Sequence, residues 1–584
     1  MPVKIVSRTE NTDFKQECDY IGNLHPVLQK IYKTRGVFHK KHLEKELANI
    51  LPYDSLKDID LAVECIANKI VNNELITIVG DFDVDGATST TLAVLILRAF
   101  GVKKVDYAIP NRFDYGYGLT PKLVESIKKY NPRLLITVDN GISSIDGVKT
   151  ANELGIDVVI TDHHLPADEK PEAVAIVNPN QHGDQFPSKN LSGVGVTFYV
   201  MLALRAKLKA IGWFDKNNIK IPNMARYLDL VALGTVADLV PLDYNNRILV
   251  SYGLELIRKN MCREGIKALL RLGKRELKKV VASDLGFAVG PRLNAAGRLE
   301  DMTLGVECLL AGNIQGAQNL ANELDALNHE RRQIEANMKL EAANYLQNKY
   351  PDKENVPLGI CLHDDNWHQG VIGIVSSRVK DLYHRPVFIF ANDGDEYIKA
   401  SGRSIKGLHL KEILDKMNST DSELLVKYGG HAMAAGLSIK KDSFEKFEKL
   451  FIDTISQVLR EDNNILDKII ETDGILSHAD FNLDLARLIK YAEPWGQEFS
   501  EPVFHGKFKI IEQKILSDKH LKLKVEPVFE HRNTMSLNAI AFNIDREKWP
   551  NFEAEFVNIV YKLDINVYSG LTSLQLLIDH IEAI

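Results

Sequence analysis

Three aspartates, Asp81, Asp83 and Asp85, alternate within one short segment, GDFDVDGATS. The segment follows an apolar run that is typical of a buried strand and precedes small residues that open a predicted helix. Such a loop lies at the carboxyl edge of a parallel sheet, where open α/β proteins bind ligands. Carboxylates this close repel one another without cations, so the pattern indicates a metal site. A solvated acidic loop is the alternative, whereas a calcium loop of the EF-hand type is disfavoured because its twelfth position, Leu92, is apolar.

Two further predicted strands end in polar side chains. TVDNG places Asp139 at the same sheet edge, and TDHH adds Asp162, His163 and His164. A single histidine at a strand end is more often a core residue, but one that follows two acidic strand ends favours metal binding. Mixed aspartate and histidine ligands suit Mn²⁺, Mg²⁺ or Zn²⁺, and the weight of carboxylates favours the first two. Two such ions, roughly 3.5 to 4 Å apart and sharing a carboxylate, would activate water and hold a phosphoryl group.

Alternating strand and helix patterns must position these residues. From residue 74 to 179, β-branched runs alternate with segments of helical period, which predicts an α/β fold with a mostly parallel sheet. Helices are expected to dominate from Val194 to Lys274. Further along, turn residues at Pro291 to Gly297 are expected to interrupt the helical pattern. The strands are expected at 75–79, 134–138, 157–160 and 173–177, and the helices at 87–100, 121–130 and 142–154.

The remaining sequence predicts a long helix, a second α/β domain and a small β-barrel. Residues 314–350 contain no proline and keep one apolar face, which indicates a connecting helix. Short alternating runs after residue 471 favour a five-stranded barrel of the OB type. The expected organisation is an N-terminal segment (1–73), a first α/β domain (74–313), the connecting helix (314–350), a second α/β domain (351–460) and the barrel (471–584).

Composition excludes several classes of protein. The chain has 584 residues, 45% of them hydrophobic, and a net charge of −7, which argues against bulk coating of nucleic acid. No apolar run approaches the roughly 18 residues of a membrane span, and the first residues lack an apolar signal core, so we expect a cytoplasmic protein that does not bind membranes. The five cysteines are scattered and never in CxxC spacing, which disfavours disulfides and thiolate metal sites.

Several motifs together resemble one enzyme family. GDFDVDG, VDNG, TDHH and ALGTVADLVPL are similar to the four metal motifs of the DHH phosphoesterase superfamily. PNRFDYGYGL, LSGVGV, GPRLNAAGR, SGRS and YGGHAMAAG extend the resemblance to the RecJ family, in which a DHHA1 domain follows, over most of residues 74–438. The resemblance implies a two-metal exonuclease that hydrolyses single-stranded DNA from the 5′ end to nucleoside 5′-monophosphates, in DNA repair and recombination, with two Mn²⁺ or Mg²⁺ ions.

The resemblance also implies roles for individual residues. Asp139 would bridge the ions, Asp81 would bind metal or lie beside a ligand, and Asp162 would orient a histidine. Without the resemblance, Asp238 would be interpreted as a helix cap or a solvated residue. The implied metal ligands are Asp81, Asp83, Asp85, Asp139, His163 and Asp238, and the implied catalytic residues are Asp139, His163, His164 and His431.

DNA would be held by basic, aromatic and hydroxyl side chains. Arg112, Ser401 and Arg403 would bind the 5′ phosphate, with His431 near the scissile phosphate, whereas SGRS and GGH alone would be read as turns. Tyr117 could stack on a base, as could Tyr115, with loop packing as the alternative. Arg298 and Arg292 could contact phosphates or cap a helix. Lysines between Lys507 and Arg532 could form a DNA path or protect a strand edge.

Two other functions fit part of the pattern. A DHH phosphodiesterase for short oligonucleotides or cyclic dinucleotides would share the metal motifs, but the helical insertion and the barrel count against it. A non-catalytic replication scaffold would have lost metal ligands, and every motif carboxylate is present here. The expected partners of a monomeric exonuclease are single-stranded DNA, a single-strand-binding protein and a RecQ-type helicase.

Overall fold

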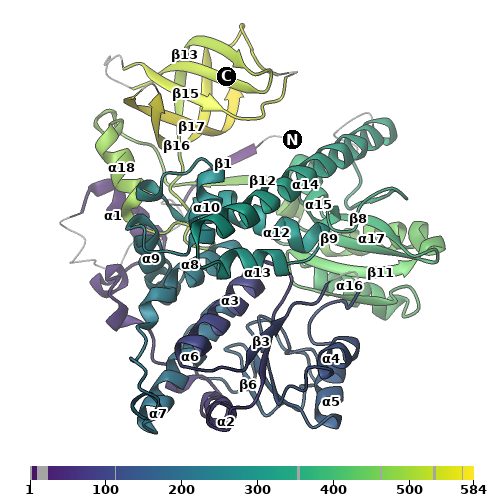
Figure 1. The fold of residues 1–584 in the computed structure, drawn as a ribbon. Coiled ribbons are helices and arrows are strands. Elements are labelled where there is room, and N and C mark those ends of the chain that lie inside the picture. The colour runs from purple at the N-terminus through teal and green to yellow at the C-terminus, as the bar shows by residue number, and fades with distance from the viewer. Residues whose placement is uncertain are drawn as a thin grey trace. The chain divides into compact units, whose positions relative to one another are not determined.

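The computed structural model describes residues 3–8, 24–111, 114–350, 356–460, 463–529, 535–546, 548–568 and 570–584 (Figure 1). Contacts divide the chain into a larger unit, residues 5–325 and 471–584, and a smaller unit built mainly from residues 326–470. The domain boundaries expected from the sequence stay predictions. Within the described residues, we find no helix with the length and apolar character needed to cross a membrane.

A five-stranded parallel sheet lies at the centre of the larger unit. Its strands follow the order β3-β2-β4-β5-β6, and every pairing is parallel. The sheet is buried because apolar, largely β-branched strands are covered by helices on both faces. The four predicted strands are confirmed to within two residues, and the edge strand β3 was not predicted because its short sequence mixes polar and apolar residues. The strands are β2 (Ile76–Val79), β3 (Val105–Ala108), β4 (Leu134–Val138), β5 (Asp157–Thr161) and β6 (Ala175–Val177).

Helices cover the two faces of this sheet in different ways. Helices α3 and α6 are buried on almost every side, since they pack on the sheet, on each other and on further helices. Helices α4 and α5 form a separate apolar layer on the opposite face. The helices of these layers are α2 (Ile59–Val71), α3 (Val84–Ala99), α4 (Pro121–Lys128), α5 (Ile145–Glu153) and α6 (Gly193–Ala210).

A helical region completes the first part of the larger unit. Here the expected turn at Pro291 to Gly297 is wrong, because these residues belong to helix α12. Pro291 falls in the first turn of that helix, where a missing N–H is tolerated, and a π-helical turn, η7 (Leu285–Val289), precedes it. The helices are α7 (Trp213–Lys216), α8 (Leu228–Ala237), α9 (Tyr244–Arg258), α10 (Glu264–Leu272), α11 (Ala282–Asp284), α12 (Gly290–Leu299) and α13 (Thr303–Leu310).

The predicted connecting helix is confirmed as α14 (Ile314–Lys349), and its residues from Ala326 onward belong to the smaller unit. That unit contains a mixed sheet of order β10-β11-β9-β8-β7, in which only β7 and β8 are parallel. One apolar cluster on the sheet includes α16 and α17, and another includes α15 and α14. The elements are β7 (Ile360–His363), α15 (Ile372–Tyr383), β8 (Val387–Asp393), β9 (Tyr397–Arg403), α16 (Leu410–Thr420), β10 (Lys427–Gly430), β11 (Ala434–Lys440) and α17 (Phe444–Leu459).

The C-terminal strands close into the expected five-stranded barrel. The strand order is β13-β14-β15-β17-β16, and pairing of β13 with β16 closes the barrel, so these five strands leave no open edge. Alternate residues such as Leu521, Leu523 and Val525 fill its interior. The strands are β13 (Phe504–Leu516), β14 (His520–Pro527), β15 (Leu537–Ala541), β16 (Phe556–Tyr568) and β17 (Leu571–Ala583).

The N-terminal segment and the residues before the barrel lie together. Strand β1 (Val3–Ser7) pairs with β12 (Lys468–Thr472), and helices α1 (Pro26–Thr34) and α18 (Leu483–Ala492) lie on the same side in Figure 1. Three short 3-10 turns, η2 (Lys40–Leu43), η3 (Leu47–Asn49) and η4 (Tyr53–Ser55), follow α1. Cys65, Cys262, Cys308 and Cys361 are free thiols, and Cys18 lies outside the described residues.

Candidate metal centre

The acidic loop between β2 and α3 folds back tightly on itself. Asp83 caps helix α3, because its Oδ1 accepts a hydrogen bond of 3.1 Å from the Gly86 N–H. A Cβ atom on Gly86 would lie 2.5 to 2.7 Å from the backbone of Asp81, so only glycine permits this approach. Helix α12 supports the loop as well, since the Val84 N–H donates to Oδ1 of Asn294 at 3.2 Å. The loop is therefore held from both sides.

Asp85 is fixed by the N-terminus of helix α6. Its Oδ2 accepts from the Gly193 N–H at 2.6 Å and its Oδ1 from the Val194 N–H at 3.0 Å. Helix N-termini favour such a carboxylate. Two glycines make the approach possible: a Cβ on Gly193 would lie 2.5 Å from Oδ1 of Asp139, and one on Gly234 would lie 2.6 Å from Oδ1 of Asp85. The LSGVGV motif thus supplies a fixed backbone beside two carboxylates.

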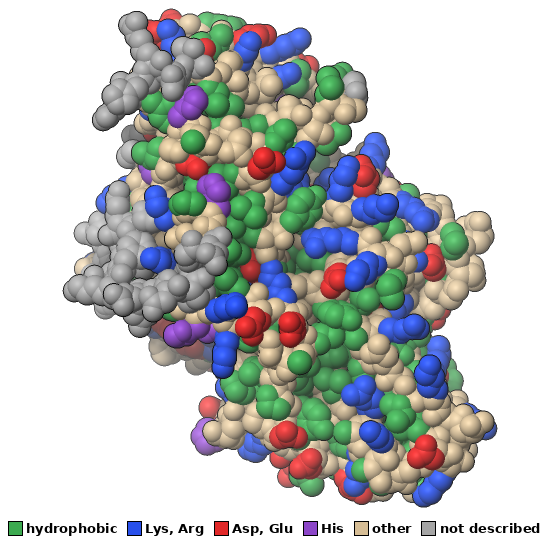
Figure 2. All heavy atoms as spheres, turned by 90° about the vertical axis from the view of Figure 1, so that its left-hand side faces the viewer, with side chains coloured by type: hydrophobic (Ala, Val, Ile, Leu, Met, Phe, Trp, Pro, Cys, Tyr) green, Lys and Arg blue, Asp and Glu red, His purple; other side chains and the backbone are tan. Residues whose placement is uncertain are grey.

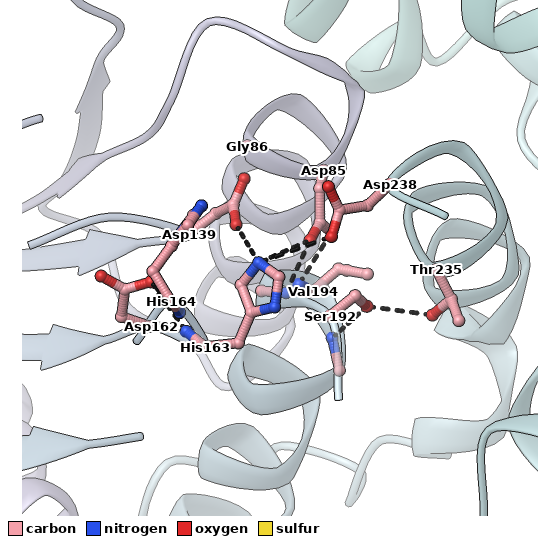
Figure 3. Close-up of polar contacts among 12 residues, drawn as sticks. Asp85, Gly86, Asp139, Asp162, His163, His164, Ser192, Val194, Thr235 and Asp238 are labelled. Carbon is pink, nitrogen blue, oxygen red and sulfur yellow. Dashed lines mark hydrogen bonds and ion pairs between the residues drawn. The ribbon is translucent and has the colours of Figure 1, made fainter. Parts of the chain in front are cut away.

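His163 lies among three carboxylates that come from different elements (Figure 3). Its Nε2 is 3.2 Å from Oδ1 of Asp139, which follows β4, and 3.5 Å from Oδ2 of Asp238 at the end of α8. Oδ2 of Asp85 in α3 is 4.0 Å away. Asp139 has a left-handed backbone with φ of +61°, which aspartate tolerates better than most residues. The strand ends therefore converge as the sequence pattern predicted, and the end of α8 joins them, as the family resemblance implied.

The side chains can form two neighbouring ligand sets. Asp81, Asp83 and Asp139 make one set and Asp85, His163 and Asp238 another, and within each set the ligand atoms lie within 4.8 Å of one another. Asp139 and His163 also group with His164. Asp139 belongs to the first set, and its Oδ1 lies 3.2 Å from Nε2 of His163 in the second, which is compatible with the predicted role of Asp139 as the bridging carboxylate. All six residues predicted as metal ligands are brought together here, and their role as ligands stays a prediction.

The electrostatics of the cluster favour a cation. Burial, and then repulsion by neighbouring carboxylates, raises the pKa of Asp139 and of Asp238 well above the ordinary value. Burial and the charge of Asp83 raise the pKa of Asp85 to about 7, although two N–H donors oppose this shift. Burial and mutual repulsion thus disfavour the charged form of these carboxyl groups unless a counter-charge is present. The residues therefore fit divalent cations, which would supply that charge.

Asp162 has the opposite environment. Burial alone would raise its pKa, but the hydrogen bond and charge of His164 lower it to about 2. Its Oδ1 lies 2.7 Å from Nδ1 of His164 and also accepts from the backbone of His163 and His164, while its Oδ2 accepts from the Ile142 N–H at 2.9 Å. Burial alone would lower the pKa of His164, but the hydrogen bond to Asp162 and the charge of Asp162 raise it to about 9. Asp162 thus orients the ring of His164.

The predicted DNA-binding residues of the larger unit differ in exposure and in their contacts. Tyr117 is 48% exposed, and its hydroxyl lies 3.4 Å from Nε2 of His164. Arg298 lies in the last turn of α12, and Arg112 lies outside the described residues. Arg292 is buried instead, and its Nε donates to Oδ1 of Asp325 at 2.8 Å. Arg292 therefore serves the packing of helices rather than a phosphate.

The predicted phosphate-binding residues of the smaller unit lie on neighbouring strands. Ser401 and Arg403 belong to β9 rather than to a turn, and the Arg403 guanidinium donates to Oγ of Ser401 at 3.1 Å. Ala434 of β11 is paired with Arg403, and the His431 N–H in the preceding hairpin donates to the carbonyl of Ala434 at 2.7 Å. The sequence did not single out Gly373, whose added Cβ would lie 2.9 Å from Oγ of Ser401.

The barrel carries a basic strand face. Lys514 of β13 is paired directly across from Lys522 of β14, whereas Lys524, which follows on the same exposed face, is paired across from Glu512. Like charges in this position are destabilising, and a closed barrel has no edge to protect. The face therefore fits a polyanion, while Arg532 lies outside the described residues.

Comparisons with known proteins agree with this architecture. Residues 75–235 match the DHH family, N-terminal domain, residues 355–459 the DHHA1 domain, and residues 472–580 the RecJ OB domain. The chain is 48% identical over 566 residues to the single-stranded-DNA-specific exonuclease RecJ of Escherichia coli K12, which covers 97% of both chains. The RecJ of Salmonella typhimurium is 49% identical over 560 residues, or 96% of both chains.

Solved structures give the same picture. The crystal structure of RecJ from Thermus thermophilus in complex with Mn²⁺ matches with a TM-score of 0.78 at 25% identity, covering 100% of this chain and 79% of that one. A crystal structure of exonuclease RecJ bound to manganese matches 70% of this chain and 97% of that one, with a TM-score of 0.57 at 30% identity.

Proposed function

This chain belongs to the RecJ family of single-stranded-DNA-specific exonucleases, and we propose that it releases nucleoside 5′-monophosphates from 5′ ends during DNA repair and recombination. It is a metal-dependent exonuclease that acts on single-stranded DNA. The observation that carries the proposal is the convergence of Asp85, Asp139 and Asp238 on Nε2 of His163. Three carboxylates and one imidazole, supplied by separate elements, fit phosphodiester hydrolysis better than a structural role.

Two Mn²⁺ or Mg²⁺ ions would be held by the two ligand sets, with Asp139 shared between them. When bound, such ions lower the pKa of a water molecule and neutralise charge on the phosphoryl oxygens. The protein's contribution is to hold the carboxylates in place before the ions bind. The N–H groups of Gly193 and Val194 fix Asp85, and the α3 cap fixes Asp83.

His164 has a separate role in the proposed reaction. Its Nδ1 is paired with Asp162, which favours the protonated ring, so the proton on Nε2 faces away from Asp162. A proton donor at that atom can bond to a non-bridging oxygen of the scissile phosphate and stabilise charge that develops during hydrolysis. The hydroxyl of Tyr117 lies beside the same atom and would support the bound nucleotide.

The 5′ phosphate would be bound by Arg112, Ser401 and Arg403, with His431 close to the scissile phosphate. Guanidinium groups suit this role because they donate two parallel hydrogen bonds to a phosphate. The pairing of Arg403 with Ser401 in β9 supports a common binding surface on this sheet. Arg298 would contact a neighbouring phosphate, and the lysine face of the barrel would bind the strand further from the cut.

The proposed cellular setting follows from the substrate. An enzyme that needs an unpaired strand depends on a helicase to open duplexes, and cells coat such strands with a single-strand-binding protein. We therefore place a RecQ-type helicase and a single-strand-binding protein among its partners, and propose that it acts as a monomer in the cytoplasm.

One experiment separates this function from its alternatives. Single-stranded and duplex DNA, labelled at either end, is incubated with the protein and manganese, magnesium or a chelator. Mononucleotides should appear from the 5′ end of single strands only, and only with metal. Release from the 3′ end, or hydrolysis of cyclic dinucleotides in place of DNA, would refute the proposal.

A further inference from the structure

The N-terminal residues 24–56 make an unusual set of buried contacts with the linker that leads to the barrel, residues 472–503. The guanidinium of Arg35, after α1, donates to both carboxylate oxygens of Asp473, at 2.6 and 2.9 Å. The same group donates to the Ser500 carbonyl at 3.1 and 3.2 Å. The side chains of Arg35 and Asp473 are only 3% and 1% exposed. The ion pair between Arg35 and Asp473 is therefore buried and is not a solvated surface contact.

Asp473 connects this contact to the first strand of the barrel. Its Oδ2 accepts from the Val503 N–H at 3.0 Å, and its own N–H donates to the Val503 carbonyl. Val503 directly precedes β13, which runs the length of the barrel. The position of β13 therefore depends on a carboxylate that Arg35 holds.

A second contact lies at the end of α18. Glu493 has a side chain that is 1% exposed, and its Oε1 lies 3.1 Å from Nζ of Lys45 and 3.2 Å from the hydroxyl of Tyr32. Arg247 of α9 approaches the other oxygen at 3.7 Å and lies 4.1 Å from the ring centre of Phe499. Three segments distant in sequence thus meet at one buried carboxylate.

Residues 24–56 also contact the body of the enzyme, by which we mean the part of the larger unit that carries the metal centre and the helices around it. The Leu51 N–H donates to Oδ1 of Asn245 at 3.0 Å, and Nη2 of Arg247 donates to the His42 carbonyl at 2.8 Å. Helix α18 in turn contacts the barrel through Lys490 and Asp564, 3.2 Å apart. Figure 2 views this side of the molecule, where basic, acidic and hydrophobic side chains are interspersed.

We propose that residues 24–56 are a clasp that positions the barrel on the body of the enzyme and thereby sets its affinity for long single strands. Arg35, Lys45 and Tyr32 are the positioning residues of this clasp. They lie in elements other than the metal centre, so turnover at the centre does not require them. The inference rests on the proposed function in one respect, namely that the barrel binds the strand beyond the cut.

The test uses two single variants of the full chain, Arg35→Gln and Lys45→Ala, because Lys45 is partly exposed and its variant should fold even if Arg35→Gln does not. Lys207→Ala is the matched control: Lys207 is 35% exposed against 33% for Lys45, and its ion pair with Glu64 lies away from the clasp. Hydrogen exchange of the amides from Asp473 to His505 measures, without DNA, how strongly the clasp stabilises the linker. Kinetics on strands of about 6 and about 40 nucleotides measure how the clasp affects DNA binding.

Both clasp variants should speed exchange in the linker by about tenfold or more, and should raise KM for the long strand by about tenfold while kcat on the short strand stays within about twofold. Lys207→Ala should change neither. Unchanged exchange, or faster exchange with an unchanged KM for the long strand, would overturn the clasp. If the wild type bound both lengths equally, the role of the barrel in the proposed function would fail, and exchange alone would decide whether the clasp holds the linker.

Discussion

Replacing Gly193 by alanine tests whether the metal centre depends on the backbone of helix α6. The new Cβ would lie 2.5 Å from Oδ1 of Asp139, roughly 1 Å closer than an ordinary contact. Asp139 is buried, so either its carboxylate or the helix must move, which costs about 1 to 3 kcal/mol. Movement of the helix would also weaken two hydrogen bonds to Asp85, each of which contributes about 1.5 to 3 kcal/mol.

The expected result is a Kd for Mn²⁺ that rises about 10-fold to 100-fold, as for other changes to groups that orient metal ligands. Titration calorimetry on the metal-free protein measures this change directly, and hydrolysis of labelled single strands should fall in parallel at limiting manganese. Excess manganese should restore part of the activity, because the ligands themselves are intact.

Gly195→Ala is the matched control in the same helix turn. The nearest atoms to a Cβ there would be those of the Leu191 side chain at 3.3 Å and Oγ of Ser192 at 3.5 Å, and neither residue is a predicted metal ligand. Alanine also favours helix, so stability should change by less than about 1 kcal/mol and manganese affinity should be unchanged. Equal manganese affinity in the two variants would refute the argument that α6 positions Asp85 and Asp139.

Three further predictions address other parts of the enzyme. Asp139→Asn should abolish hydrolysis yet leave single-strand binding, measured by fluorescence anisotropy, within about threefold, because a ligand is lost but not the DNA-binding surface. The paired His164, whose pKa is raised to about 9, stabilises the metal-free fold below its ordinary pKa of about 6.5 and loses this effect as pH rises through about 9. Asp162→Asn should lose backbone hydrogen bonds at any pH, and should destabilise the fold by a further amount of about 1 to 3 kcal/mol at pH 6 relative to pH 10, because only the pairing with His164 depends on pH. An equal destabilisation relative to the wild type at the two pH values would contradict this. Arg403→Ala should raise KM and reduce the preference for 5′-phosphorylated over 5′-hydroxyl ends about tenfold or more, and an unchanged preference would place the phosphate site elsewhere.

The sequence predicted the parallel sheet and the convergence of its acidic strand ends for a simple physical reason. Buried parallel strands are continuous apolar runs, and their carboxyl ends must meet at one edge. Asp81, Asp139 and His163 could therefore be grouped without a structure. Asp238 could not, because a carboxylate at the end of an apolar helix carries no local signal of its partners.

Residues whose role depends on tertiary contacts were missed. Asn140 donates to the carbonyls of both Val79 and Val138 and so joins two strand ends, and Asn294 reaches the acidic loop from more than 200 residues away in the chain. Strand β9 was overlooked because Ser401 and Gly402 are typical of turns. Gly402 instead makes room for the ring of Phe388, from which an added Cβ would be only 2.3 Å away. Such a glycine serves packing rather than backbone freedom.

The contrast between Asp139 and Asp162 explains how neighbouring carboxylates acquire different roles. Both are buried at adjacent strand ends, yet burial and repulsion raise the pKa of Asp139, whereas bonding to His164 lowers that of Asp162. The oxygens of Asp162 are already occupied by donors from Ile142, His163 and His164, so a metal ion would have to displace them. Oδ1 of Asp139 accepts no hydrogen bond from the described residues. Environment, rather than residue type, thus makes Asp139 available to a cation and reserves Asp162 for orienting the histidine.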